Sequence, residues 1–203
     1  MRLHKIAPEY RGQVRLVERA FPLEVYGGGP PNRSELEQEM WLAAIQEPEA
    51  EFKPFGDEWP ATTLPAFQAA WAAAQQGEAA AHDMDLRIRR AFFAEARNIG
   101  RGDVVTELAR EAGLDMLRFA RDFASSQARD AVLAEGGLGK EKYGVSGTPT
   151  AMLTDGTRLE LPQVEPQMQD GRVVSAGRLP CCGEECYAAT RRLFDEALKR
   201  GPM

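Results

Sequence analysis

The fold is decided by one stretch of sequence, Tyr143-Gly144-Val145-Ser146-Gly147-Thr148-Pro149-Thr150. It leads into a short apolar run that ends at Leu153, which predicts a strand. Residues 154–157, with Asp-Gly at their centre, predict a turn, and residues 158–161 predict the returning strand. On spacing alone, Pro149 is typical of an ordinary trans proline that begins a strand. This stretch therefore leads into a predicted β-hairpin.

The region before it, residues 34–138, predicts an all-α segment. Ser34, with Glu37 three positions later, is typical of a capping box at the start of a helix. Apolar residues at helical spacing then predict five more helices, at 64–76, 82–98, 103–112, 115–125 and 126–135. Prolines and a glycine interrupt residues 48–63 and predict a loop. We expect exposed aromatic side chains on this loop at Phe52, Phe55 and Trp59.

The two ends of the chain carry other patterns. Residues 1–10 place apolar side chains at helical spacing and predict the end of an amphipathic helix. Residues 14–21 are rich in β-branched and apolar residues and predict a strand, and the glycines and prolines of residues 27–32 predict a linker. Near the C-terminus, Asp170-Gly171 predicts a hairpin turn, and a last helix is expected over residues 184–199.

Several segments carry a family resemblance. Arg19-Ala20-Phe21-Pro22-Leu23 resembles a second strand, residues 98–105 and 112–115 resemble a helical-insertion signature, and residues 143–150 resemble a cis-proline loop. All are features of the DsbA family of thioredoxin-like proteins, in the branch that includes FrnE-like proteins and 2-hydroxychromene-2-carboxylate isomerases. The resemblance spans about residues 10–155.

The resemblance implies an α/β, thioredoxin-like fold with an all-α helical insertion. Residues 1–30 and 140–203 are expected to form the thioredoxin-like domain, without its first strand, and residues 34–138 the insertion. The resemblance also implies a cis peptide bond before Pro149, which turns the exposed backbone toward an extended substrate beside reactive thiols. The residues that it assigns to substrate docking are Gly147, Thr148 and Pro149.

The sequence departs from the family at the reactive site. In the DsbA family, a Cys-x-x-Cys motif begins the first helix, directly after the first strand, where the helix dipole lowers the thiol pKa. This chain has no cysteine before Cys181, and residues 1–10 resemble only the end of that helix. Three explanations stay open. In the first, which we favour, Met1 is internal to a longer product that carries the motif upstream. In the second, the chain is a truncated, redox-inert relative. In the third, a second subunit supplies the missing strand in a homodimer.

The cysteines cluster at the start of the expected last helix, at Cys181, Cys182 and Cys186. A helix N-terminus favours thiolates, whereas Glu184 and Glu185 oppose them. Cys182 and Cys186 are one helical turn apart, so a reversible disulfide, and hence a displaced dithiol, is feasible. The alternatives are reduced cysteines that act as small hydrophobic residues, or a metal site that needs a fourth ligand from elsewhere. We expect no metal and no cofactor.

Composition narrows the function classes. A length of 203 residues fits one domain with an insertion, and a net charge of −6 argues against a nucleic-acid or anionic-membrane binder. The chain has no apolar run of membrane-spanning length and no signal-peptide core at its N-terminus, so a cytoplasmic location is expected.

The resemblance to the DsbA family implies a thiol–disulfide oxidoreductase or isomerase that exchanges disulfides with protein or peptide substrates. In this chain the dithiol is either absent or displaced to the clustered cysteines, and the docking residues are expected to be Gly147, Thr148 and Pro149. Two alternatives stay open. One is a redox-inactive protein that binds peptides through the same loop. The other is a glutathione-dependent isomerase of the 2-hydroxychromene-2-carboxylate type, although no particular residue of the sequence favours that activity.

Overall fold

The computed structural model describes residues 2–27, 29, 32–46, 50–161, 166–170, 172–176 and 184–200. The chain divides into two compact units. We call one the terminal unit, formed by Met1–Glu18, Gln38–Ala50 and Pro149–Met203. The other is the helical unit, formed by Arg19–Glu37 and Glu51–Thr148. The domain boundaries expected from the sequence differ from these and stay a prediction.

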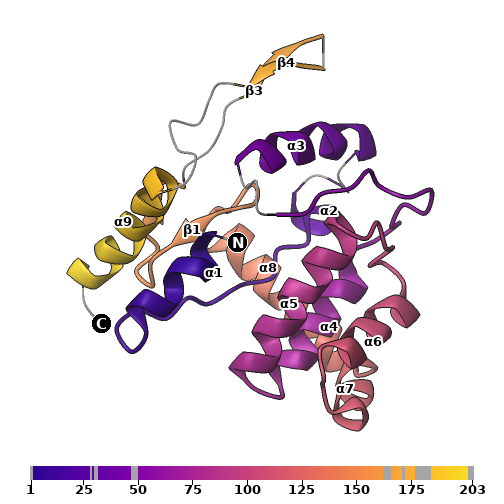
Figure 1. Cartoon of the computed structure of the whole chain (residues 1–203). Helices are drawn as coiled ribbons and strands as arrows, with labels where there is room; N and C mark the ends of the chain where they lie inside the picture. Colours follow the sequence, from indigo (N-terminus) through magenta and orange to yellow (C-terminus); the bar gives the residue numbers. More distant parts are fainter. Residues whose placement is uncertain are drawn as a thin grey trace. The chain divides into compact units, whose positions relative to one another are not determined.

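The helical unit is built around one alanine-rich helix (Figure 1). Its helices are α2 (Leu23–Tyr26), α4 (Leu64–Ala74), α5 (Glu78–Phe93), α6 (Gly102–Glu111), α7 (Met116–Phe123) and α8 (Ser126–Glu141). Helix α4 packs against α5, α6, α7 and α8, because its buried alanines allow close approach on several sides. The largest fully buried side chains of this unit are Met84, Val105, Leu108, Phe119 and Val132. The five helices expected between residues 64 and 135 are confirmed, and α8 continues to Glu141.

Local signals explain most of the helix ends. Asp115 caps α7 by accepting hydrogen bonds from the backbone N–H groups of Leu117 and Arg118. Gly113 ends α6 with a φ of +72°, a conformation that glycine adopts without strain. The capping box expected at Ser34 is wrong. Helix α3 (Arg33–Gln46) begins one residue earlier, and the Asn32 Oδ1 accepts the Ser34 N–H at 2.8 Å.

The loop before α4 is more buried than expected. Phe55 is only 7% exposed, so its prediction as an exposed aromatic residue is wrong. Its ring lies 4.8 Å from that of Phe92 on α5 and 5.1 Å from that of Trp59. Phe52 and Trp59 are half-buried. The aromatic rings pack on α5 because burial of such large apolar surfaces outweighs the polar character of the loop around them.

The terminal unit combines two hairpins with helices from both chain ends. Its elements are α1 (Arg2–Ile6), the 3-10 helix η1 (Ala7–Tyr10), β1 (Ala151–Met152), β2 (Arg158–Leu159), β3 (Pro166–Gln169), β4 (Arg172–Ala176) and α9 (Glu184–Arg200). Strands β1 and β2 pair antiparallel, as do β3 and β4, so both predicted hairpins are confirmed. Helix α1 packs on α9, and the ring of Tyr10 stacks on that of Phe194 at 4.9 Å.

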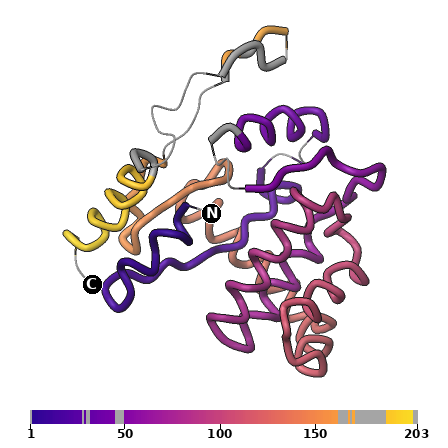
Figure 2. Tube along the Cα trace, viewed as in Figure 1, coloured from indigo at the N-terminus to yellow at the C-terminus, as the bar shows by residue number. Residues whose placement is uncertain are grey.

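The strand predicted over residues 14–21 is wrong. In the structure, residues 14–22 belong to no helix or strand. The tube in Figure 2 follows the segment after α1 and η1 without a helical coil. A strand needs a neighbour for its hydrogen bonds, and each strand in the described residues pairs only within its own hairpin. Membrane-spanning helices are also missing from the described part of the chain, where none is long and apolar enough.

Candidate functional site

The candidate docking residues lie on an exposed loop between α8 and β1. Ser146, Thr148, Pro149 and Thr150 are exposed, and Gly147 is half-buried. The loop follows a fixed point at Val145, which is 6% exposed and whose backbone N–H donates to the Gly139 carbonyl at 2.9 Å. Gly144 adopts a φ of +60° and reverses the chain after α8. The docking loop, residues 146–150, therefore leaves α8 from a buried anchor.

Phe21 packs at Gly139, the glycine whose carbonyl accepts the Val145 N–H. A Cβ atom placed on Gly139 would lie 3.2 Å from Phe21 Cδ2 and 3.8 Å from Val145 Cγ2. Phe21 is 7% exposed. The side chains of Phe21 and Val145 thus both pack at Gly139, and the segment of residues 19–22 supports the start of the docking loop.

A second glycine of α8, Gly136, lets an aromatic and a proline side chain lie on the helix. A Cβ on Gly136 would come within 2.5 Å of the Tyr26 ring and 3.1 Å of Pro22 Cδ. The Tyr26 hydroxyl donates to the Leu133 carbonyl at 2.7 Å. Sequence reasoning missed this contact because it ended the helix at residue 135. The available signal was a set of glycines, including Gly137, in a helical pattern, which often marks close packing.

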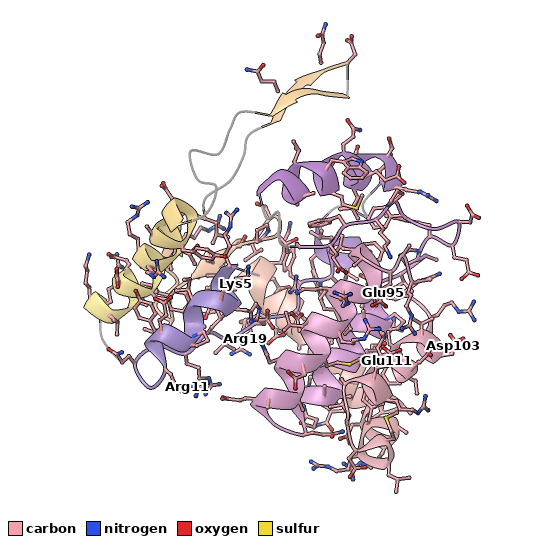
Figure 3. All side chains as sticks on the ribbon, in the orientation of Figure 1. Lys5, Arg11, Arg19, Glu95, Asp103 and Glu111 are labelled. Atoms are coloured by element: carbon pink, nitrogen blue, oxygen red, sulfur yellow. The ribbon has the colours of Figure 1, made fainter. Side chains whose placement is uncertain are left out.

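Glu135 attaches residues 19–22 to α8 through hydrogen bonds. One carboxylate oxygen accepts a hydrogen bond from Arg19 Nη1 at 2.7 Å, and the other accepts one from the Ala20 backbone N–H at 2.6 Å. The Glu135 side chain is 28% exposed and that of Arg19, labelled in Figure 3, is 72% exposed. The carboxylate therefore makes one part-buried hydrogen bond, to the Ala20 backbone, and one exposed ion pair, with Arg19.

The predicted dithiol lies almost wholly outside the described residues. Cys181 and Cys182 are not among them, and for Cys186 the structure gives only a backbone position in the first turn of α9. Beside that position, the Tyr187 hydroxyl accepts a hydrogen bond from Lys5 Nζ at 3.1 Å, and the same ammonium lies over the Tyr187 ring. The dithiol stays a prediction.

Comparison with known proteins identifies the family. The family model described as thioredoxin matches residues 50–164, more than half of the chain, including the docking loop. The chain belongs to the DsbA-like thioredoxin family. Within that family match lie the insertion helices and the β1–β2 hairpin, whereas the three cysteines lie beyond it.

One solved structure shares the fold of this chain. The chain is similar to the cytosolic disulfide reductase DsbM from Pseudomonas aeruginosa, with a TM-score of 0.63 and 20% sequence identity. The likeness covers 96% of this chain and 89% of that one. At this identity it shows the fold alone, and it confirms the predicted thioredoxin-like fold with a helical insertion. Among curated proteins, none matches this chain.

Proposed function

We propose that this protein is a thiol–disulfide oxidoreductase that docks protein or peptide substrates on Gly147, Thr148 and Pro149. The observation that carries the proposal is the exposed docking loop, anchored at buried Val145, in a chain of the DsbA-like thioredoxin family. A loop that is exposed at Thr148 and Pro149 and leads into a strand suits an extended peptide, since main-chain hydrogen bonds bind such peptides whatever their side chains.

The proposed chemistry uses two of the three clustered cysteines. One thiolate attacks a sulfur of the substrate disulfide, forms a mixed disulfide, and expels the other substrate sulfur, which takes up a proton. The second cysteine attacks the mixed disulfide, releases the second substrate thiol, and leaves a disulfide in the protein. Two electrons thus pass from protein to substrate, and an external dithiol reduces the protein again. The candidate cysteines are Cys181, Cys182 and Cys186.

The start of α9 supports thiolate formation in this proposal. A helix N-terminus carries partial positive charge, and Lys5 adds an ammonium group beside the residue that follows Cys186. Glu184 and Glu185 act in the opposite direction. We further propose a cytoplasmic location, because the similar protein DsbM is described as cytosolic. Self-association as a homodimer stays a prediction.

Insulin reduction tests the oxidoreductase. The chain is compared with a variant that combines Cys181→Ser, Cys182→Ser and Cys186→Ser, with dithiothreitol as the electron source. We expect the wild type to accelerate the precipitation of reduced insulin and the variant to match the uncatalysed rate. These are the three cysteines of the sequence, so equal activity in both proteins would show that its thiols do not carry the reaction and would overturn the displaced dithiol.

A redox-inactive peptide-binding protein is the second candidate. It is favoured by one observation: the docking loop and its support are in place, whereas the residues before Cys181 contain no cysteine. Absence of insulin reduction by the wild type, together with peptide binding that the triple serine variant retains, would support this candidate. Titration of free thiols in air-exposed protein adds a separate criterion, since three free thiols would exclude a stable disulfide.

A further inference from the structure

We infer that Glu135 is a positioning residue for the docking loop. It holds Ala20 and, through the next residue, Phe21, which packs at Gly139, the glycine at which Val145 also packs. The inference rests on the docking role proposed for Gly147, Thr148 and Pro149, and it names the side chain that sets the loop's starting point.

The first step is the bond between Glu135 and Ala20. At 2.6 Å, this hydrogen bond joins an ionised carboxylate to a part-buried backbone N–H. Hydrogen bonds to charged groups are stronger than neutral ones, and a sheltered N–H that loses its acceptor has few other partners. The exposed pair with Arg19 contributes much less, because water screens a cation that is 72% exposed. The bond to the Ala20 backbone is therefore the one that holds the segment.

The second step leads from Phe21 to the loop. Phe21 follows Ala20 directly, so the position of the Ala20 backbone sets the point from which its ring extends. The ring packs at Gly139, where Val145 also packs. The Val145 N–H donates to the carbonyl of that glycine. A shift of Phe21 therefore changes the packing at Gly139, whose carbonyl accepts the Val145 N–H. The docking loop leaves from Val145.

Amide hydrogen exchange at Val145, followed by NMR, measures the effect without any activity assay. This amide exchanges only when its bond to Gly139 opens. Glu135→Ala is expected to speed its exchange about tenfold, because the Ala20 N–H loses a charged acceptor. Amides of α6, which are remote in sequence from the segment, are expected to keep their rates. Unchanged exchange at Val145, or equal acceleration throughout α6, would overturn the inference.

Two matched variants separate positioning from a general loss of stability. Glu135→Gln keeps an oxygen acceptor for the Ala20 N–H and is expected to hold the Val145 exchange rate within about twofold of the wild type. Arg19→Ala removes only the exposed cation and is expected to leave that rate unchanged. Acceleration by Arg19→Ala as large as that by Glu135→Ala would also overturn the inference, since the ion pair would then be the operative contact.

Insulin reduction supplies a second readout. Glu135→Ala is expected to raise KM several-fold with little change in kcat, and Glu135→Gln is expected to restore KM. A lower kcat with an unchanged KM would contradict the positioning role. The two proposals fail separately. If Glu135→Ala speeds exchange at Val145 but the wild type reduces no insulin, the positioning role is supported and the proposed oxidoreductase activity is overturned.

Discussion

Glu24 and Thr63 are joined by two hydrogen bonds, since the Thr63 N–H and hydroxyl both donate to the Glu24 carboxylate, at 2.8 and 2.5 Å. The Thr62 hydroxyl donates to the same carboxylate at 2.5 Å. Thr63 occupies the N-cap of α4 but makes no capping bond with its own side chain. Glu24, on α2, therefore supplies a negative charge at the start of the central helix, where the helix dipole favours one.

Glu24→Gln tests this capping. Burial raises the pKa of Glu24, but hydrogen bonds from Thr62, Thr63 and Leu64 outweigh it and leave the pKa below its ordinary value of 4.5. We expect the variant to lose about 1 kcal/mol of unfolding free energy at pH 7, as for other helix caps. A lowered pKa stabilises the fold above the unfolded-state value, and this contribution disappears as pH falls through the folded-state pKa. The difference from wild type is therefore expected to shrink below about pH 4.5.

Urea unfolding at pH 7 and at pH 3 measures both parts of this prediction. Glu39→Gln, at an exposed position beyond the first turn of α3, is the control and is expected to change stability by less than about 0.5 kcal/mol. A loss for Glu24→Gln that is the same at both pH values would show that the charge is not what stabilises α4.

Gly136 and Gly137 provide a test of how α2 packs on α8. Gly136→Ala would place a methyl group 2.5 Å from the Tyr26 ring, and overpacking of this kind costs about 1–3 kcal/mol. At Gly137 the nearest atom is the Tyr26 hydroxyl oxygen at 3.5 Å, an ordinary contact. Gly137→Ala is therefore expected to stabilise the helix by up to about 1 kcal/mol through its higher helix propensity. Thermal unfolding of the two variants is expected to shift in opposite directions, and a shared direction would contradict the packing described.

Signals that act within a few residues predicted the fold well. Gly113 and Asp115 were sufficient to place the end of α6 and the start of α7, because a helix stop and a cap each act on the adjacent turn. The Asp-Gly turns likewise predicted both hairpins. The strand over residues 14–21 failed, because a strand depends on a partner whose presence a local pattern does not reveal.

The candidate site was predicted in part, for the same reason. Residues 143–150 were recognisable because their glycines and proline act locally. Glu135 was not, since the bond that it makes to Ala20 joins residues far apart in sequence and depends on glycines that allow Phe21 to lie on α8. Burial of Phe55 was missed because its partner, Phe92, comes from a later helix.

Gly113→Ala is expected to destabilise the protein by about 1 kcal/mol. The φ of +72° at Gly113 is unfavourable for a residue with a side chain, and no described atom lies within 4 Å of the added methyl group, so the cost is conformational alone. Gly102→Ala, at the other end of α6, is the control. Its Cβ would meet only Phe123 Cε1 at 3.9 Å, so stability is expected to stay the same or rise. Equal losses in urea unfolding would show that the positive φ of Gly113 is not what makes the substitution costly.

Gly147→Ala separates substrate docking from stability. The backbone of Gly147 lies outside the left-handed region, and no atom of the described residues lies within 4 Å of its Cβ position, so unfolding free energy is expected to change by less than about 0.5 kcal/mol. A substrate strand that pairs with the loop backbone would meet the new methyl group, and we expect KM for insulin to rise about fivefold, close to the effect of one lost hydrogen bond. Ser146→Ala, one residue earlier and exposed, removes a hydroxyl without adding bulk and is expected to keep KM. If the wild type is active and Gly147→Ala has the same KM for insulin, close docking of the substrate on the loop backbone is ruled out.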